Sequence, residues 1–303
     1  MSEVVMARQL AARGYRPSEI ARLVRRGELT RIRRGGYVTE EADGERDRHR
    51  RLIDATLRLS STDVVVSHLS AGVLHGLPIF RDTLKRVDLT RSGRSGGYVR
   101  RAVHLHVGPL TTADRVILDG RPVTSLARTV VDVARRLPER RAVALADAAL
   151  TRGLLVDQAA AVVGGLGGHT GIGRARRVLE FADGRSESVG ESEGRVVMAV
   201  AGLPRPTLQY EVHDEHGEFV ARCDYAWVEQ RTLGEFDGLI KYGRLLKPGE
   251  TSSDVIVAEK LREDALRDLG WEVVRLIWSD LSRPAQLAAR VRRAFTRAAR
   301  RHA

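Results

Sequence analysis

Residues 12–38 read ARGYRPSEIARLVRRGELTRIRRGGYV, and this stretch decides how the amino-terminal part of the chain folds. Gly14 ends a first predicted helix, Pro17 suits the first turn of a second, and Gly27 suits its end. Leu29–Val38 carries β-branched and aromatic residues around a glycine turn, which predicts a two-stranded ribbon. The predicted order is helix, turn, helix and ribbon, which is that of a winged helix.

Arginine is concentrated in the same stretch. Nine arginines and two acids lie between Arg8 and Arg34. In the second predicted helix Ile20, Leu23 and Val24 recur at helical spacing and face a core, so the arginines between them lie outside. Such a helix reads the major groove of DNA while the ribbon contacts the adjacent backbone. The predicted DNA contacts are Arg22, Arg25, Arg26, Arg31, Arg33 and Arg34, and a solvated arginine face is the alternative.

The whole chain is basic, with a formal net charge of +12 and a pI near 10.6. Positive charge favours a polyanionic partner, because cations that neutralise phosphates release condensed counterions. Nearly all of this charge is arginine, which a GC-rich coding bias also produces. The local cluster is therefore better evidence for DNA binding than the total charge.

The length of 303 residues corresponds to about two domains of average size. No run approaches the roughly 18 apolar residues that a membrane span needs, and the first residues lack the layout of a signal peptide. Cys223 is the only cysteine, which excludes a disulfide framework and a cysteine-based zinc site. We therefore expect a cytoplasmic protein without a membrane partner.

We expect an α+β multidomain protein whose winged helix-turn-helix domain spans residues 1–42 and whose mixed α+β domain spans residues 43–160. In the second domain Val87–Thr90 and Val103–Val107 alternate at period two and are predicted as paired strands. His104 and His106 share one strand face. Without a third ligand at a defined spacing, this pattern favours a polar strand face over a metal site.

Residues 161–185 are predicted as a glycine-rich connector followed by a helix. The run from Gly164 to Gly173 superficially resembles a phosphate-binding loop. No predicted strand leads into it and no Gly-Lys-Ser/Thr follows it, so a flexible interdomain connector is favoured.

Residues 186–303 predict a third domain in the order helix, three strands, helix and strand, ending in a basic helix. Two of the predicted strands carry the acids Asp224, Glu235 and Asp237, and strict alternation puts Asp224 on one face with Arg222 and Ala226. Clustered carboxylates repel one another unless a cation lies between them. The predicted metal ligands are Asp224, Glu235 and Asp237, and Mg²⁺ is the ion that suits them, because it prefers oxygen ligands.

The stretch quoted above resembles the amino-terminal winged-helix domain of AbiEi-type antitoxins, the transcription-repressing half of type IV abortive-infection toxin–antitoxin systems. The sequence DGRPVTSLARTVVDVARRLP, residues 119–138, extends the resemblance to about residue 155. The resemblance implies DNA binding and autoregulation, a role in phage defence, and a cognate toxin protein as a partner.

Residues 186–282 resemble the PD-(D/E)XK nuclease superfamily, closest to the very-short-patch-repair-like endonucleases. The likeness rests on a helical glutamate, an aspartate, a Glu-x-Asp element and a Gly-Trp-x-Val-x-Arg strand. It implies a restriction-endonuclease-like α/β domain with the catalytic residues Glu191, Asp224, Glu235 and Lys241. Asp237 stands where the superfamily usually has lysine, and Lys241 or Lys260 would replace that lysine. Two functions follow, a DNA-binding regulator or a Mg²⁺-dependent endonuclease, and an inactive nuclease fold is the alternative to the second.

Overall fold

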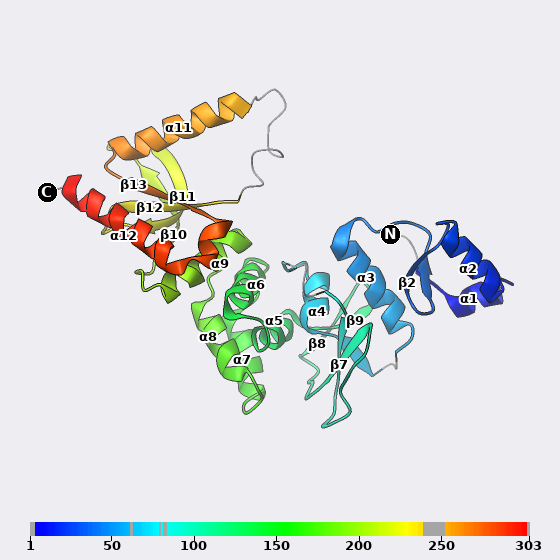
Figure 1. Cartoon of the computed structure of the whole chain (residues 1–303). Helices are drawn as coiled ribbons and strands as arrows, with labels where there is room; N and C mark the ends of the chain where they lie inside the picture. Colours follow the sequence, from blue (N-terminus) through cyan, green and yellow to red (C-terminus); the bar gives the residue numbers. More distant parts are fainter. Residues whose placement is uncertain (1–3, 61–62, 79, 81–83, 239–251, 302–303) are drawn as a thin grey trace. The chain divides into compact units, whose positions relative to one another are not determined.

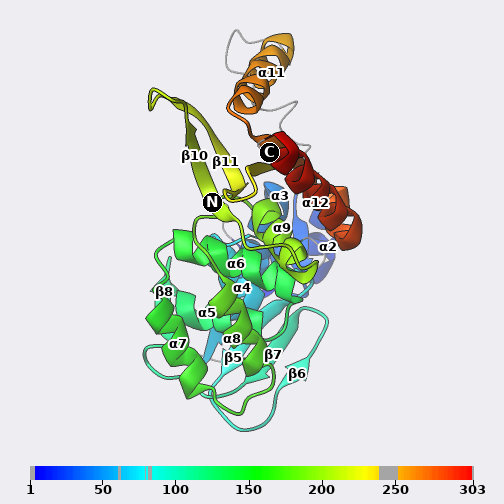
Figure 2. The same cartoon turned by 90° about the vertical axis from the view of Figure 1, so that its left-hand side faces the viewer.

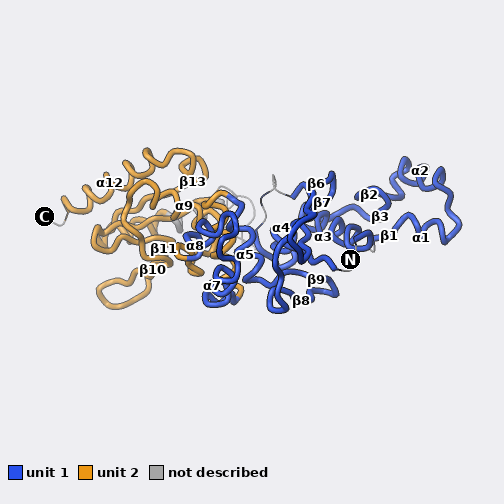
Figure 3. Tube along the Cα trace, turned by 90° about the horizontal axis from the view of Figure 1, so that it is seen from below, with its two compact units in different colours: residues 1–137, 153–179 blue, residues 138–152, 180–303 orange. Residues whose placement is uncertain are grey.

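The computed structural model describes residues 4–60, 63–78, 80, 84–238 and 252–301. These residues form a mixed α+β protein with three separate sheets. The chain divides into two compact units, residues 1–137 with 153–179 and residues 138–152 with 180–303 (Figure 3). No helix within the described part of the chain is long and apolar enough to cross a membrane.

The amino-terminal region of the first unit contains two helices and a small antiparallel sheet in the order β1-β3-β2 (Figure 1). Its elements are β1 (Val5–Met6), α1 (Ala7–Ala12), α2 (Pro17–Arg25), β2 (Thr30–Arg33) and β3 (Gly36–Val38). Pro17 opens α2, and Gly27 follows its end with a φ of +76° that favours glycine. The predicted helices and ribbon are present, and β1 adds a strand that the sequence did not indicate.

A six-stranded sheet in the order β6-β7-β5-β4-β9-β8 forms the rest of the first unit together with its helices. The elements are α3 (Gly44–Leu57), β4 (Val64–Val66), α4 (His68–Leu74), β5 (Val87–Arg91), β6 (Tyr98–Val99), β7 (Val103–Val107), β8 (Arg115–Leu118), β9 (Arg121–Thr124), α5 (Leu126–Ala134), α7 (Val156–Gly165) and α8 (Ile172–Phe181). The predicted pairing of residues 87–90 with 103–107 is confirmed, and the two strands are parallel. Their alternate residues Val87, Leu89 and Leu105 fill the core beneath α3 and α4.

The glycine-rich run at 164–173 is packed structure rather than the flexible connector that the sequence favoured. Helix α7 continues to Gly165, and α8 begins at Ile172. Gly171, at a φ of +83°, lies so close to α5 that an added Cβ would be 2.4 Å from the carbonyl oxygen of Arg135. The glycine therefore serves a close approach of two segments.

The second unit is a four-stranded sheet, β10-β11-β12-β13, with helices on both faces (Figures 1 and 2). Its elements are α6 (Glu139–Thr151), α9 (Val189–Val200), β10 (Thr207–His213), β11 (Phe219–Trp227), β12 (Thr232–Asp237), α11 (Ser252–Asp268), β13 (Glu272–Ile277), a 3-10 helix η1 (Trp278–Ser282) and α12 (Pro284–Arg301). Apolar residues of α9 and α12 pack on one face, and Leu266 of α11 packs on the other. The predicted order of helices and strands is present, and β13 pairs with β12 in parallel.

Helix α6 belongs to the second unit, although the sequence placed it in the domain that ends at residue 160. Arg195 of α9 and Asp147 of α6 form an ion pair of 2.7 Å in which both side chains are buried. The same carboxylate accepts a hydrogen bond from the main-chain nitrogen of Asp183. These contacts join segments nearly 50 residues apart in sequence, so no local composition change marks the boundary.

Candidate functional sites

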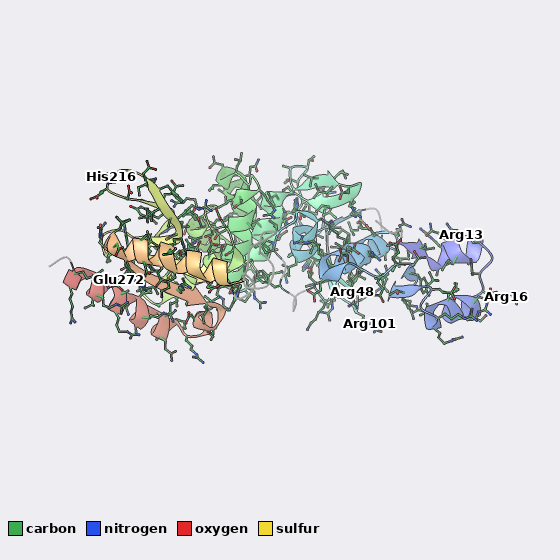
Figure 4. The ribbon with its side chains drawn as sticks, turned by 90° about the horizontal axis from the view of Figure 1, so that it is seen from above. Arg13, Arg16, Arg48, Arg101, His216 and Glu272 are labelled. Carbon is green, nitrogen blue, oxygen red and sulfur yellow. The ribbon has the colours of Figure 1, made fainter. Side chains whose placement is uncertain are left out.

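Three of the six predicted DNA contacts lie exposed on α2. Ile20 of this helix is buried together with Leu10 and Leu29, which turns the opposite side of α2 to solvent. Arg22, Arg25 and Arg26 are exposed there. Arg13 and Arg16 lie at the turn between α1 and α2 and point outward (Figure 4). The structure therefore gathers arginines from α2 and from the turn before it.

The three predicted contacts on the ribbon differ from one another. Arg31 and Arg34 are exposed. Arg33 turns inward, and its Nη1 donates a 2.6 Å hydrogen bond to Oγ1 of Thr56 in α3. Burial lowers the pKa of Arg33 below its ordinary value. Arg33 thus ties the ribbon to α3, and the strand pattern alone did not distinguish it from its exposed neighbours.

A groove of about 1190 Å³ extends from the ribbon across α3 to the strands β5 to β7. Its basic side chains come from sequence positions far apart, and they are Arg31, Arg33, Arg34, Arg48, Lys85, Arg91, Arg100 and Arg101. Glu45 is the one acid among the described residues that line it. The guanidinium of Arg100 lies 4.5 Å from the ring centre of Tyr98. We call this groove with its basic lining the cationic groove; Figure 4 labels Arg48 and Arg101.

The sequence did not predict the cationic groove beyond residue 34. Arg91 ends β5, and Arg100 and Arg101 lie in the turn of the short hairpin between β6 and β7, where the sequence indicated only a glycine-rich link between strands. The density of arginine in residues 91–101 was the available signal. Only the fold brings these residues next to the ribbon.

Glu191 lies near the start of α9 and is buried. Its Oε2 accepts hydrogen bonds from the main-chain nitrogen of Glu187 at 2.8 Å and from Nε2 of Gln209 at 3.0 Å. Burial, and then the nearby Asp224 carboxylate, raise the pKa of Glu191 above its ordinary value. Two of the predicted catalytic acids are thus close enough to influence each other.

Asp224 lies where β11 and β12 part. The hydrogen-bonded ladder between these strands extends from the pair Tyr225 and Gly234 to the pair Trp227 and Thr232. Just beyond it, Oδ2 of Asp224 accepts a 2.7 Å hydrogen bond from the main-chain nitrogen of Phe236. The carboxylate takes the place of a strand carbonyl.

The alternation that the sequence predicted for this strand is wrong around Asp224. Cys223 and Ala226 both pack on the α11 side of the sheet, and Tyr225 packs on the α9 side. Gln209, on the neighbouring strand β10, has a φ of +51°. The irregular backbone at this point shifts the facing of the side chains by one residue.

Glu235 faces α11 and is held there by Arg262. Nη1 and Nη2 of Arg262 donate to the two carboxylate oxygens at 2.6 and 3.0 Å. Within the described residues, Asp224, Glu235 and Asp237 do not form a group whose ligand atoms all lie within 4.8 Å of one another. In the structure Asp224 is bonded in the gap between the strands and Glu235 is paired with Arg262.

The two lysines proposed for the nuclease motif have different outcomes. Lys241 lies outside the described residues. Lys260 is exposed on α11.

The structure supplies the third ligand that the two strand histidines lacked. Asp88 of β5 is the register partner of His104 on the parallel strand β7. Among the described residues, Asp88, His104 and His106 are the one group of three whose ligand atoms lie within 4.8 Å of one another. Burial, and then the neighbouring His106, lower the pKa of His104. The sequence could not reveal this cluster by spacing, because its members come from two strands.

Comparison with known proteins gives a partial family match and two full-length relatives. Residues 3–39 match the family described as "Transcriptional regulator, AbiEi antitoxin". The crystal structure of the RV2827C protein from Mycobacterium tuberculosis is similar with a TM-score of 0.40 and 17% identity, over 70% of this chain and 83% of that one. "Uncharacterized protein MT2308" and "Uncharacterized protein Rv2248", from two strains of M. tuberculosis, are each 35% identical over 283 residues, which cover 91% of this chain and 95% of each relative. The chain therefore belongs to the family of these two M. tuberculosis proteins, and its amino-terminal residues match the AbiEi antitoxin regulators.

Proposed function

We propose that the chain is a DNA-binding transcriptional regulator of the AbiEi antitoxin type. In this proposal α1, α2 and the ribbon act as a winged helix, with α2 in the major groove and the ribbon on the phosphate backbone. The observation that carries it is the exposed arginine face of α2 in a segment that matches this regulator family. An antitoxin of this type also binds a cognate toxin protein.

The charges of the described residues favour a long DNA contact rather than a short one. Arg31 and Arg34 of the ribbon also line the cationic groove, which continues to Arg100 and Arg101. Arginine suits such a surface because its planar guanidinium pairs with phosphate oxygens and stays charged. DNA held by α2 would therefore also neutralise charges along the groove.

The arginine face of α2 is tested by changing Arg22, Arg25 and Arg26 together to alanine. If each contacts a phosphate, the slope of log affinity against log salt falls by about 3 in magnitude, since each contact contributes about 0.9. The measurement is fluorescence anisotropy with the protein's own promoter DNA at several salt concentrations.

A variant with Arg176, Arg293 and Arg300 changed to alanine is the matched control, because these exposed arginines carry the same charge and lie outside α2 and the groove. The control keeps the native slope if α2 carries the contact. An equal loss in both variants would show that only net charge matters, and unchanged binding by the α2 variant would refute the assignment.

A second function, a Mg²⁺-dependent DNA endonuclease in the second unit, is favoured by one observation. Glu191 and Asp224 influence each other electrostatically at the point where two strands part. A buried acid whose pKa is raised, with a second carboxylate beside it, is typical of sites that bind metal ions or move protons. In this proposal Asp224 would hold a Mg²⁺ ion that supplies Lewis-acid chemistry for phosphodiester cleavage, and Glu235 would exchange its pairing with Arg262 for the metal.

Plasmid, linear and single-stranded DNA with Mg²⁺ or Mn²⁺ test this second function. Cleavage should disappear in Asp224→Ala and in Glu235→Ala. Glu215→Ala is the control, because Glu215 lies exposed in the turn between β10 and β11, where it pairs with His216. Cleavage that persists in both site variants would exclude the proposed site.

A further inference from the structure

We propose that Asp88, His104 and His106 form a binding site for a divalent transition-metal ion, with Zn²⁺ as the best chemical fit. This site lies in the six-stranded sheet of the first unit. It adjoins the cationic groove through Lys85, which lines both, and its three ligands are not among the residues proposed to contact DNA.

The parallel register of β5 and β7 brings the three ligands together. Asp88 pairs with His104, and the two-residue period of a strand puts His106 on the same face. Nε2 of His106 lies 2.8 Å from Oδ1 of Asp88, and Nδ1 of His104 lies 3.6 Å from the same oxygen. The imidazole rings of the two histidines are 3.8 Å apart between centres.

These distances suit a tetrahedral ion. Two ligand atoms bound to zinc at about 2.0–2.1 Å are separated by about 3.4 Å. The distances from the Asp88 oxygen to the two histidine nitrogens lie on either side of this value. Small rotations of the side chains therefore suffice, and the ion replaces the contact between His106 and Asp88.

The donor set selects the class of ion. Imidazole nitrogen together with a carboxylate suits Zn²⁺ and related transition metals, whereas Mg²⁺ and Ca²⁺ prefer oxygen ligands. Three protein ligands leave one position of a tetrahedron for a water molecule or another ligand. The cluster opens into a pocket of about 280 Å³, which has room for that fourth ligand.

His68 holds the site from the interior. Its ring stacks on His106 with the centres 3.7 Å apart, and its Nδ1 lies 3.0 Å from Oγ of Ser67. His68 is buried and has a φ of +49°, a conformation that costs energy for a residue with a side chain. The packed fold keeps this conformation, and the stacked ring fixes the orientation of His106.

Three cations at the rim of the pocket oppose a bound metal ion. Lys85, Arg86 and Arg136 line the opening, and all three are exposed. Nε of Arg86 donates to the main-chain oxygen of Arg100. Solvent screens exposed charges strongly, while the Asp88 carboxylate is mostly shielded and would contact the ion directly. The attraction between the ion and its three ligands is therefore expected to exceed the repulsion from the three rim cations.

The site is tested with the full chain, prepared without a histidine tag and treated with a chelator. Titration calorimetry with Zn²⁺ should show one ion per chain, and Co²⁺ should give the visible absorption of a tetrahedral complex. His104→Gln and Asp88→Asn should each lower the Zn²⁺ affinity by more than about tenfold, because a lost ligand costs at least as much as the loss of an outer-shell partner.

His216→Gln is the matched control. His216 lies in the exposed turn between β10 and β11 and should leave the affinity unchanged (Figure 4). His104 is partly exposed, so its replacement leaves the fold intact, and circular dichroism verifies this. Zn²⁺ should raise the thermal unfolding temperature of the native chain and of His216→Gln but not of His104→Gln. Absence of binding, or equal affinity in the native chain and both site variants, would overturn the proposal.

Discussion

Asp224 and Glu235 lie on adjacent strands, yet their carboxylates have different partners. One replaces a carbonyl in the gap between β11 and β12, and the other pairs with Arg262 of α11. The sequence identified both acids as unusual for a strand interior. It could not predict their separation, because that depends on an irregular backbone and on an arginine 27 residues away.

The buried pair of Asp147 and Arg195 has a large expected effect on stability. Both side chains are almost fully buried, and Nε of Arg195 also donates to Ser186. Asp147→Ala leaves a buried guanidinium without its counter-charge, so the free energy of unfolding should fall by about 3–5 kcal/mol. Urea unfolding of the full chain, followed by circular dichroism, measures this change.

Two variants control the interpretation of that experiment. Replacing both partners, with Asp147→Leu and Arg195→Met, removes both charges and should cost much less than the single change. Glu187→Ala breaks an exposed ion pair with Arg222 and should cost only about 0–1 kcal/mol. A loss of the same size in Asp147→Ala and Glu187→Ala would contradict the buried pair's importance.

At the scale of elements, the sequence predicted what local patterns control. Pro17 and Gly27 mark the ends of α2, and the apolar alternation of β5 and β7 marks those strands. The pairing of Asp88 with His104 and the packing of α6 against α9 are long-range events. Amphipathic spacing contains no information about which distant element will be the neighbour.

Helix α9 approaches the sheet closely where Gly190 lies against Phe236 of β12. A Cβ at Gly190 would lie 2.1 Å from Cε1 of Phe236, so Gly190→Ala must push α9 away from β12. Overpacking of this kind costs about 1–3 kcal/mol, and chemical unfolding of the full chain measures it.

Gly164 in α7 is the control for Gly190, because a Cβ there would have no atom within 4 Å outside its neighbours and its own helix backbone. Gly164→Ala should leave stability unchanged or raise it by up to about 1 kcal/mol, since alanine favours a helix over glycine. The two substitutions are chemically identical, and only Gly190→Ala is expected to lower stability. Equal effects would show that the contact between α9 and Phe236 does not limit stability.

At the scale of the whole molecule, the fold shows where part of the basic charge is concentrated. The net charge alone was weak evidence, because arginine dominates the composition throughout. The fold concentrates cations from residues 31–101 in one groove with a single acid among its described lining residues. Composition predicted a polyanionic partner, and only the three-dimensional arrangement indicates where such a partner would lie.

The chain passes between its two units more than once, because residues 138–152 belong with residues 180–303. Neither unit is therefore encoded by one uninterrupted stretch of gene. A recombination that exchanged everything after residue 160 with a distant relative would keep Asp147 from one parent and take Arg195 from the other. Exchange of the second unit between members of this family should therefore succeed only when both parents retain this ion pair, which ties the inheritance of the two halves together.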